Sequence, residues 1–184
     1  MRQIKMLKVK VLFFIFWILF CASAAFAYGL EIGANAPCFK VVSGDAQALT
    51  LEDIKGKATG IFYETTDVVG QNSLLKEALG KYYQTQPEAI RKLMVRLPVI
   101  NCSRVLWLFA GVYRSQFRKH SQVENITIYA DWSGKMFSAY DIEDAKSNVF
   151  LIDKKGIIRY YRAGKIEGKE IEKVVSLFKE LVEE

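Results

Sequence analysis

The sequence predicts an α/β fold, in which a central mixed β-sheet is flanked by helices and preceded by an N-terminal β-hairpin. Residues 56–79 contain an apolar strand, a polar loop and an amphipathic helix, in that order. A second apolar run, residues 97–102, follows after a helical stretch, which is the pattern of a right-handed crossover between parallel strands. Residues 149–153 and 157–161 are joined by a Lys-Lys-Gly turn, which predicts a final hairpin before a closing helix over residues 167–183.

The unit at residues 56–79 organises the rest of the chain. Residues 58–63 are mostly apolar and suit a strand that is buried on both faces, so we expect this strand to be the central one. After the polar loop 64–71, apolar residues recur with the period of a helix, and Asn72 or Ser73 is available as the N-cap. The hairpin is expected earlier, around the Gly44-Asp45 turn.

This unit resembles that of thioredoxin-like proteins of the exported redoxin (TlpA) type, in which Gly-Lys, an apolar strand, a Cys-x-x-Cys loop and a helix follow one another. Residues 33–39 are similar to the Gly-x-x-Ala-Pro-x-Phe opening of those proteins. Residues 147–153 resemble their Pro-Thr-x-Phe-Leu-Ile-Asp segment, whose cis-proline faces the dithiol. The resemblance implies a thioredoxin-like fold.

The residues of the dithiol site are replaced in this chain. Residues 67–71 read Asp-Val-Val-Gly-Gln where the dithiol is expected, and Ser147 occupies the proline position. Disulfide exchange needs a thiolate of lowered pKa at a helix N-terminus, so ordinary exchange is not expected here. The pattern looks like that of the YtfJ-type branch, periplasmic thioredoxin-like proteins without the dithiol.

The resemblance therefore favours a binding role over catalysis, with a protein or peptide as the partner. We expect the partner to lie in a groove between the loop after the first strand and the segment at the proline position. The residues of this groove would be Thr65, Thr66, Asp67, Gln71, Ser147 and Asn148.

The first 27 residues have the three regions of a secretory signal peptide. A basic start is followed by the apolar stretch 11–20 and by Ala25-Phe26-Ala27, which supplies small residues at both recognition positions. We expect cleavage before Tyr28, a single domain over residues 28–184, a periplasmic location and no stable membrane anchor after cleavage. The alternatives are an uncleaved anchor and lipid modification at Cys21, whose preceding Phe20 is atypical of lipoproteins.

The basic character of the chain belongs mostly to this N-terminal segment. The formal net charge is +6, and residues 1–27 contain four basic and no acidic residues, which leaves +2 for the remainder. No cluster of Lys and Arg with interleaved aromatic residues stands out after residue 28, so nucleic acid is not an expected partner.

Cys38 and Cys102 remain after removal of the signal peptide. They could form a structural bridge, a reactive pair or two buried small side chains, and we predict that they are unpaired. An alternative function is that of a thiol oxidoreductase or peroxidase that works through Cys102, with or without Cys38.

The stretch 104–120 is expected to be a helix whose first half, residues 105–112, is apolar nearly all round. Such a segment is typical of a buried core helix, but it could also be an exposed patch, and then the chain would be a membrane-associated interaction module. A shorter helix is expected over residues 88–95.

No cofactor or metal site is predicted. His120 is the only histidine, and Asp67, Asp131 and Asp153 each stand where a strand gives way to a loop, so turn formation explains them better than metal binding.

Overall fold

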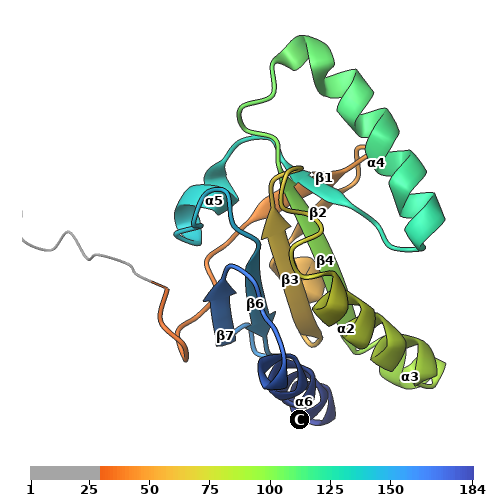
Figure 1. Cartoon of the computed structure of the whole chain (residues 1–184), viewed down its shortest axis with the longest axis vertical. Coiled ribbons are helices and arrows are strands. Elements are labelled where there is room, and N and C mark those ends of the chain that lie inside the picture. The colour runs from red at the N-terminus through yellow and green to blue at the C-terminus, as the bar shows by residue number, and fades with distance from the viewer. Residues whose placement is uncertain (1–29) are drawn as a thin grey trace, which may run out of the picture.

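A computed structural model describes residues 30–184 as one seven-stranded mixed sheet with helices on both faces (Figure 1). The predicted signal peptide lies outside these residues. The strands are β1 (Lys40–Ser43), β2 (Ala48–Thr50), β3 (Ala58–Glu64), β4 (Met94–Asn101), β5 (Tyr129–Asp131), β6 (Asn148–Ile152) and β7 (Ile158–Ala163). The helices are α2 (Ser73–Thr85), α3 (Glu88–Arg91), α4 (Ala110–Glu124), α5 (Lys135–Ala139) and α6 (Lys169–Glu183), with short 3₁₀ turns η1 (Glu52–Ile54) and η2 (Trp107–Phe109). The predicted α/β class, mixed sheet and N-terminal hairpin are confirmed.

The strand order is β2-β1-β5-β4-β3-β6-β7. Strand β3 pairs in parallel with β4 along its whole length and antiparallel with β6, and every residue of β3 is buried. Strand β3, which was expected to be central, is therefore an interior strand. The middle strand of the sheet is its neighbour β4. The difference arises because β5 and the β1–β2 hairpin add three strands on the β4 side.

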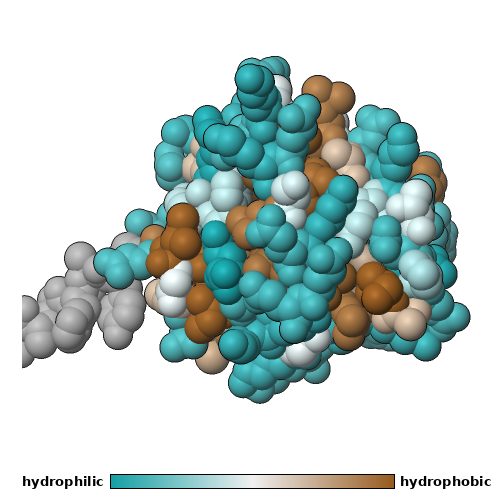
Figure 2. All heavy atoms as spheres, turned by 90° about the horizontal axis from the view of Figure 1, so that it is seen from below, coloured by the Kyte–Doolittle hydropathy of each residue, from teal (hydrophilic) through white to brown (hydrophobic). Residues whose placement is uncertain are grey.

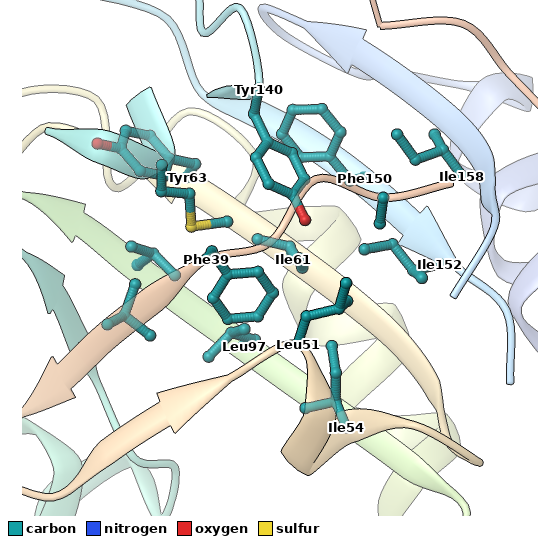
Figure 3. Packing of buried hydrophobic residues seen from close by; sticks show 14 of the residues in the cluster. Phe39, Leu51, Ile54, Ile61, Tyr63, Leu97, Tyr140, Phe150, Ile152 and Ile158 are labelled. Carbon is teal, nitrogen blue, oxygen red and sulfur yellow. The ribbon is translucent and has the colours of Figure 1, made fainter. Parts of the chain in front are cut away.

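Alternate residues of β3 point to opposite faces of the sheet and enter two separate cores. On one face, Ile61 and Tyr63 pack against residues from the N-terminal segment, η1, α5 and β6 (Figure 3). Tyr140 and Phe150 lie edge to face there, with ring centroids 5.3 Å apart. This core attaches the β1–β2 hairpin to the sheet.

On the other face, α2 and α6 cover β3 and its neighbour β6 (Figure 1). Phe62 packs with Leu75 and Leu79 of α2 and with Phe178 of α6. The closing helix was predicted over residues 167–183, and its apolar stripe is buried as its period requires.

Two predicted helices differ from the structure. The helix expected over 88–95 is the short α3, because the chain is already extended at Met94 to pair with the start of β3, and Ala89 is exposed. The helix expected from residue 104 begins at Ala110, after a loop and η2, and ends where Asn125 takes a left-handed conformation (φ 48°). None of the helices within residues 30–184 has the length and apolar character needed to cross a membrane.

Candidate functional site

The carboxyl ends of the parallel strands β3 and β4 lie side by side, because Glu64 is paired with Ile100. The loop 65–72 after β3 and the loop 102–106 after β4 therefore leave the same edge of the sheet, as the sequence predicted. In open α/β sheets this edge is where ligands bind.

A buried carboxylate occupies the end of β3. The Glu64 side chain is 1% exposed and accepts an ion-paired hydrogen bond from Lys76 Nζ of α2 at 2.6 Å. The Ser147 hydroxyl donates to the other carboxylate oxygen, also at 2.6 Å. Burial raises the pKa of Glu64, and the charge of Lys76 and the two hydrogen bonds oppose that rise. Glu64 is thus held by groups from two other segments of the chain.

Asn72 and Gln71 extend these contacts into what we call the Glu64 network, made of Glu64, Gln71, Asn72, Lys76 and Ser147. Asn72 Nδ2 donates to Ser147 Oγ at 2.9 Å and to the Gly164 carbonyl at 3.0 Å, and Asn72 Oδ1 accepts from the Ile166 amide at 2.8 Å. The Ser147 amide donates to Gln71 Oε1 at 2.8 Å. Asn72, one of the two residues predicted as the helix N-cap, does occupy the N-cap position of α2, but its side chain makes no capping hydrogen bond and instead ties three segments together.

The predicted groove is closed at its far side. The structure brings Gln71 and Ser147 into contact, yet Ser147 and Asn148 have no exposed surface. Asn148 uses its amide within the fold, since Nδ2 donates to the carbonyls of Glu143 and Lys146 and Oδ1 accepts from the Tyr161 hydroxyl. These two residues therefore support the loop and do not line a surface.

The remaining residues of the predicted groove lie in the loop after β3. Thr66 and Asp67 are exposed, and Thr65 is half-buried. They are the part of the predicted site that a partner could reach.

Both cysteines are free thiols, which confirms that they are unpaired. Cys102 follows β4, is 1% exposed and packs with Ile100, Phe117 and Ala130. Burial, aided by the nearby charge of Asp131, raises the pKa of the Cys102 thiol to about 12. A thiol in this state is not a nucleophile near neutral pH. Cys38 is exposed at the start of the hairpin.

The three aspartates do not form a cluster. Asp131 accepts from the amides of Ser133, Gly134 and Phe137, so it organises the turn after β5. Asp153 does the same in the turn between β6 and β7. Within residues 30–184, no group of three His, Cys, Asp or Glu side chains is placed to hold a metal ion.

An exposed apolar surface runs from the end of the loop after β4 through η2 into the first turn of α4, and we call it the 106–112 surface. Trp107 is 86% exposed, and the other members are between 49% and 61% exposed, namely Leu106, Leu108, Phe109 and Val112. The interpretation of this stretch as a buried core helix is therefore wrong. The start of α4, which belongs to the 106–112 surface, lies at the opposite end of the molecule from α6 (Figure 1). At the face seen in Figure 2, in contrast, hydrophilic residues dominate and separate the hydrophobic groups.

A cavity of about 660 Å³ lies between α2 and α4, over β4. It reaches from the loop after β3 to Arg96, and it includes Lys76 and His120 among its lining residues. No role was predicted from the sequence for Glu64, Lys76 or Arg96. The sequence does contain a signal for two of them. Glu64 and Arg96 are each a charged residue at an alternating position of an otherwise apolar strand.

The order of elements and the position of the site edge are those of the thioredoxin-like fold. The structure is similar to that of a candidate thiol:disulfide interchange protein DsbE from Chlorobium tepidum, with a TM-score of 0.62 and 16% identity over 84% of this chain and 99% of that one. It is also similar to a peroxiredoxin-like protein from Aquifex aeolicus, with a TM-score of 0.56 and 18% identity over 83% and 88% of the two chains.

A third similar structure is the exposed lipoprotein thioredoxin of Streptococcus pneumoniae, with a TM-score of 0.55 and 20% identity over 77% of this chain and 99% of that one. At these identities the likeness establishes the fold alone. The predicted thioredoxin-like fold is confirmed.

Within this class, residues 97–181 match the model of a family described as "Bacterial protein of unknown function (YtfJ_HI0045)". The chain thus has a thioredoxin-like fold, and its residues 97–181 are similar to the YtfJ type, as the sequence predicted. Comparison with curated proteins finds no match.

Proposed function

We propose that this chain is an exported thioredoxin-like binding protein, which holds a protein or peptide partner at the carboxyl edge of its sheet and performs no dithiol chemistry. The observation that carries the proposal is the Glu64 network. Gln71 lies where the resemblance places the dithiol and Ser147 where it places the cis-proline, and both belong to this set of mutually hydrogen-bonded polar side chains that fix the loop after β3. Such a network stabilises one conformation and offers no nucleophile.

The thiol-dependent alternative is opposed by the state of Cys102. Its sulfur is buried and its pKa is raised to about 12, whereas exchange requires an accessible thiolate. An insulin reduction assay tests this point, and we expect turnover no faster than that of the reductant alone. Turnover close to that of a thioredoxin, lost in Cys102→Ser, would contradict the proposal.

The 106–112 surface supports the partner role, because the segment that carries it follows β4 and starts at the same sheet edge as the loop after β3. Contiguous exposed apolar patches on soluble proteins mark interaction sites, and tryptophan is prominent among the residues that dominate binding energy. An ion pair of 2.9 Å between Arg104 and Asp144 attaches the loop that leads to this surface to the segment before β6.

Crosslinking in the native cell envelope tests the partner role. The variant Trp107→Ala should lose a specific crosslinked species by at least tenfold. A matched control is Val123→Ala, which truncates another exposed apolar side chain of the same helix region, 76% exposed, outside the 106–112 surface. Equal crosslinking of the two variants and the unaltered protein would mean that the partner does not bind at the 106–112 surface.

Export is part of the same proposal. It is supported by the three signal regions in residues 1–27 and by the occurrence of the same fold in an exposed lipoprotein. We propose cleavage after Ala27 and a periplasmic location for residues 28–184.

A second candidate function is association with a membrane surface. It is favoured by the 86% exposure of Trp107 next to exposed leucine and phenylalanine side chains, since such residues insert at the lipid interface. Flotation with lipid vesicles separates the two candidates, because a protein-binding module stays at the bottom of the gradient.

A further inference from the structure

The cavity between α2 and α4 has the size and the lining of a small-molecule site. Its volume of about 660 Å³ lies within the range of roughly 300–1,000 Å³ that is common for such sites. The floor is formed by Phe62 of β3 and by Pro98 and Ile100 of β4, and apolar side chains of both helices, Leu79 and Phe117, form the walls. An apolar body would be shielded from water there on several sides.

Arg96 is a cation at the end of this floor. Arg96 is half-buried and lies over the ring of Tyr83, 4.3 Å from its centroid. Within residues 30–184 it forms no ion pair and no side-chain hydrogen bond, whereas Lys76 at the other end is paired with Glu64. Burial lowers the pKa of Arg96, as expected for a guanidinium that no carboxylate compensates.

Three other titratable side chains line the cavity: Glu77 of α2, and His120 and Glu124 of α4. All three stand at exposed positions of their helices, where water screens their charge. Arg96 differs from them because it belongs to the sheet and its charge is partly shielded from water. An anion would therefore gain more from Arg96 than it would lose to the exposed carboxylates.

We propose that this cavity binds a single-chain anionic amphiphile, with its anionic group against Arg96 and its apolar chain along β4 toward Ile100. At a rise of about 3.3 Å per residue, the floor between these two residues is about 13 Å long, which suits an alkyl chain of medium length. Binding of such a ligand would be a further activity, separate from the proposed partner binding. The cavity does not include Trp107 among its lining residues.

Isothermal titration of the purified protein with dodecanoate, below its micelle concentration, tests the proposal. We expect saturable binding at one site. The variant Arg96→Met should weaken dodecanoate binding about tenfold and leave dodecanol binding unchanged, because only the charged head is affected. The matched control Lys81→Met removes an exposed cation of α2 that does not line the cavity, and it should bind dodecanoate as the unaltered protein does.

A second variant keeps the test decisive if Arg96→Met does not fold. Gln116→Trp fills the cavity from an exposed position of α4 and should abolish binding of both dodecanoate and dodecanol. Trp107→Ala should bind dodecanoate normally, so loss of partner crosslinking and loss of ligand binding are separable. No saturable binding, equal affinity of Arg96→Met and the unaltered protein for dodecanoate, or undiminished binding by Gln116→Trp would each overturn the proposal.

Discussion

Replacement of Lys76 by methionine should destabilise the fold by an amount that depends on pH. Methionine keeps much of the apolar contact of the lysine side chain but removes its charge. Glu64, which is 1% exposed, would then keep only the hydrogen bond from Ser147. Removal of one partner from a buried ion pair costs about 3–5 kcal/mol. Because the Lys76 side chain is 29% exposed and water can partly replace it, we expect about 3 kcal/mol at neutral pH.

The pH dependence follows from the raised pKa of Glu64. The folded protein binds this proton more tightly than the unfolded chain does, so the free energy of unfolding falls as the pH rises through the folded-state pKa. Loss of Lys76 raises that pKa further, because the burial cost is then unopposed by a cation. The deficit of the variant should therefore be largest at neutral pH and should shrink as the pH falls toward 4.5, the ordinary pKa of a glutamate side chain.

Urea unfolding of the unaltered protein and of Lys76→Met at pH 7.5 and pH 5 measures both effects. A loss of about 3 kcal/mol corresponds to a melting temperature lower by roughly 6–12 °C for a domain of this size. The double variant Glu64→Gln/Lys76→Met should recover most of the loss, and Lys81→Met, an exposed lysine of the same helix, should lose less than about 0.5 kcal/mol. A deficit below about 1 kcal/mol, or one that is equal at both pH values, would refute the assignment of Glu64 as a buried, ionised partner.

Three further predictions concern other parts of the chain. Asn72→Ala removes three hydrogen bonds, two of them buried and one partly buried, and should reduce the free energy of unfolding by about 2–4 kcal/mol in urea titrations, whereas a loss below about 1 kcal/mol would show that water replaces the amide. A chromogenic disulfide reagent should modify Cys38 at once and Cys102 only after unfolding, and equally fast reaction of both thiols would contradict the burial of Cys102. The intact mass of the exported protein should correspond to a chain that begins at Tyr28, and retention of residues 1–27 would show that no cleavage occurs.

The elements that pack by simple periodicity could be predicted from the sequence. The strand at β3, the loop after it, the parallel pairing with β4 and the stripe of α6 all follow from runs and spacings of apolar residues. The positions of β6 and β7 follow from the turn between them, where Gly156 has a positive φ of 84°. The start of β4 could not be predicted, because the helical spacing of Ala89, Leu93 and Met94 favoured a helix over residues 88–95.

The exposure of residues 106–112 could not be predicted either, because hydropathy reports what a side chain favours and not what covers it. An apolar segment is buried only if another element is available to pack on it. Here Phe117 of α4 packs on Ile100, Cys102 and Ala130, so the helix is anchored by its middle turns and its first turn extends past the sheet edge. Arg118 also ties this part of α4 to the hairpin, by donating to the Gly44 carbonyl at 3.0 Å.

The same anchoring explains why the cavity and the exposed surface occur together. Helix α2 covers β3, and α4 packs near β1 and β5, so neither helix fully covers the face of β4 that carries Arg96 and Pro98. At the end of β3, the Glu64 network ties the start of α2 to Ser147 and Glu64 through Asn72 and Lys76. The sheet edge at which the resemblance places thiol chemistry is thus fixed by buried polar contacts in this chain, and the exposed 106–112 surface and the cavity lie beside it.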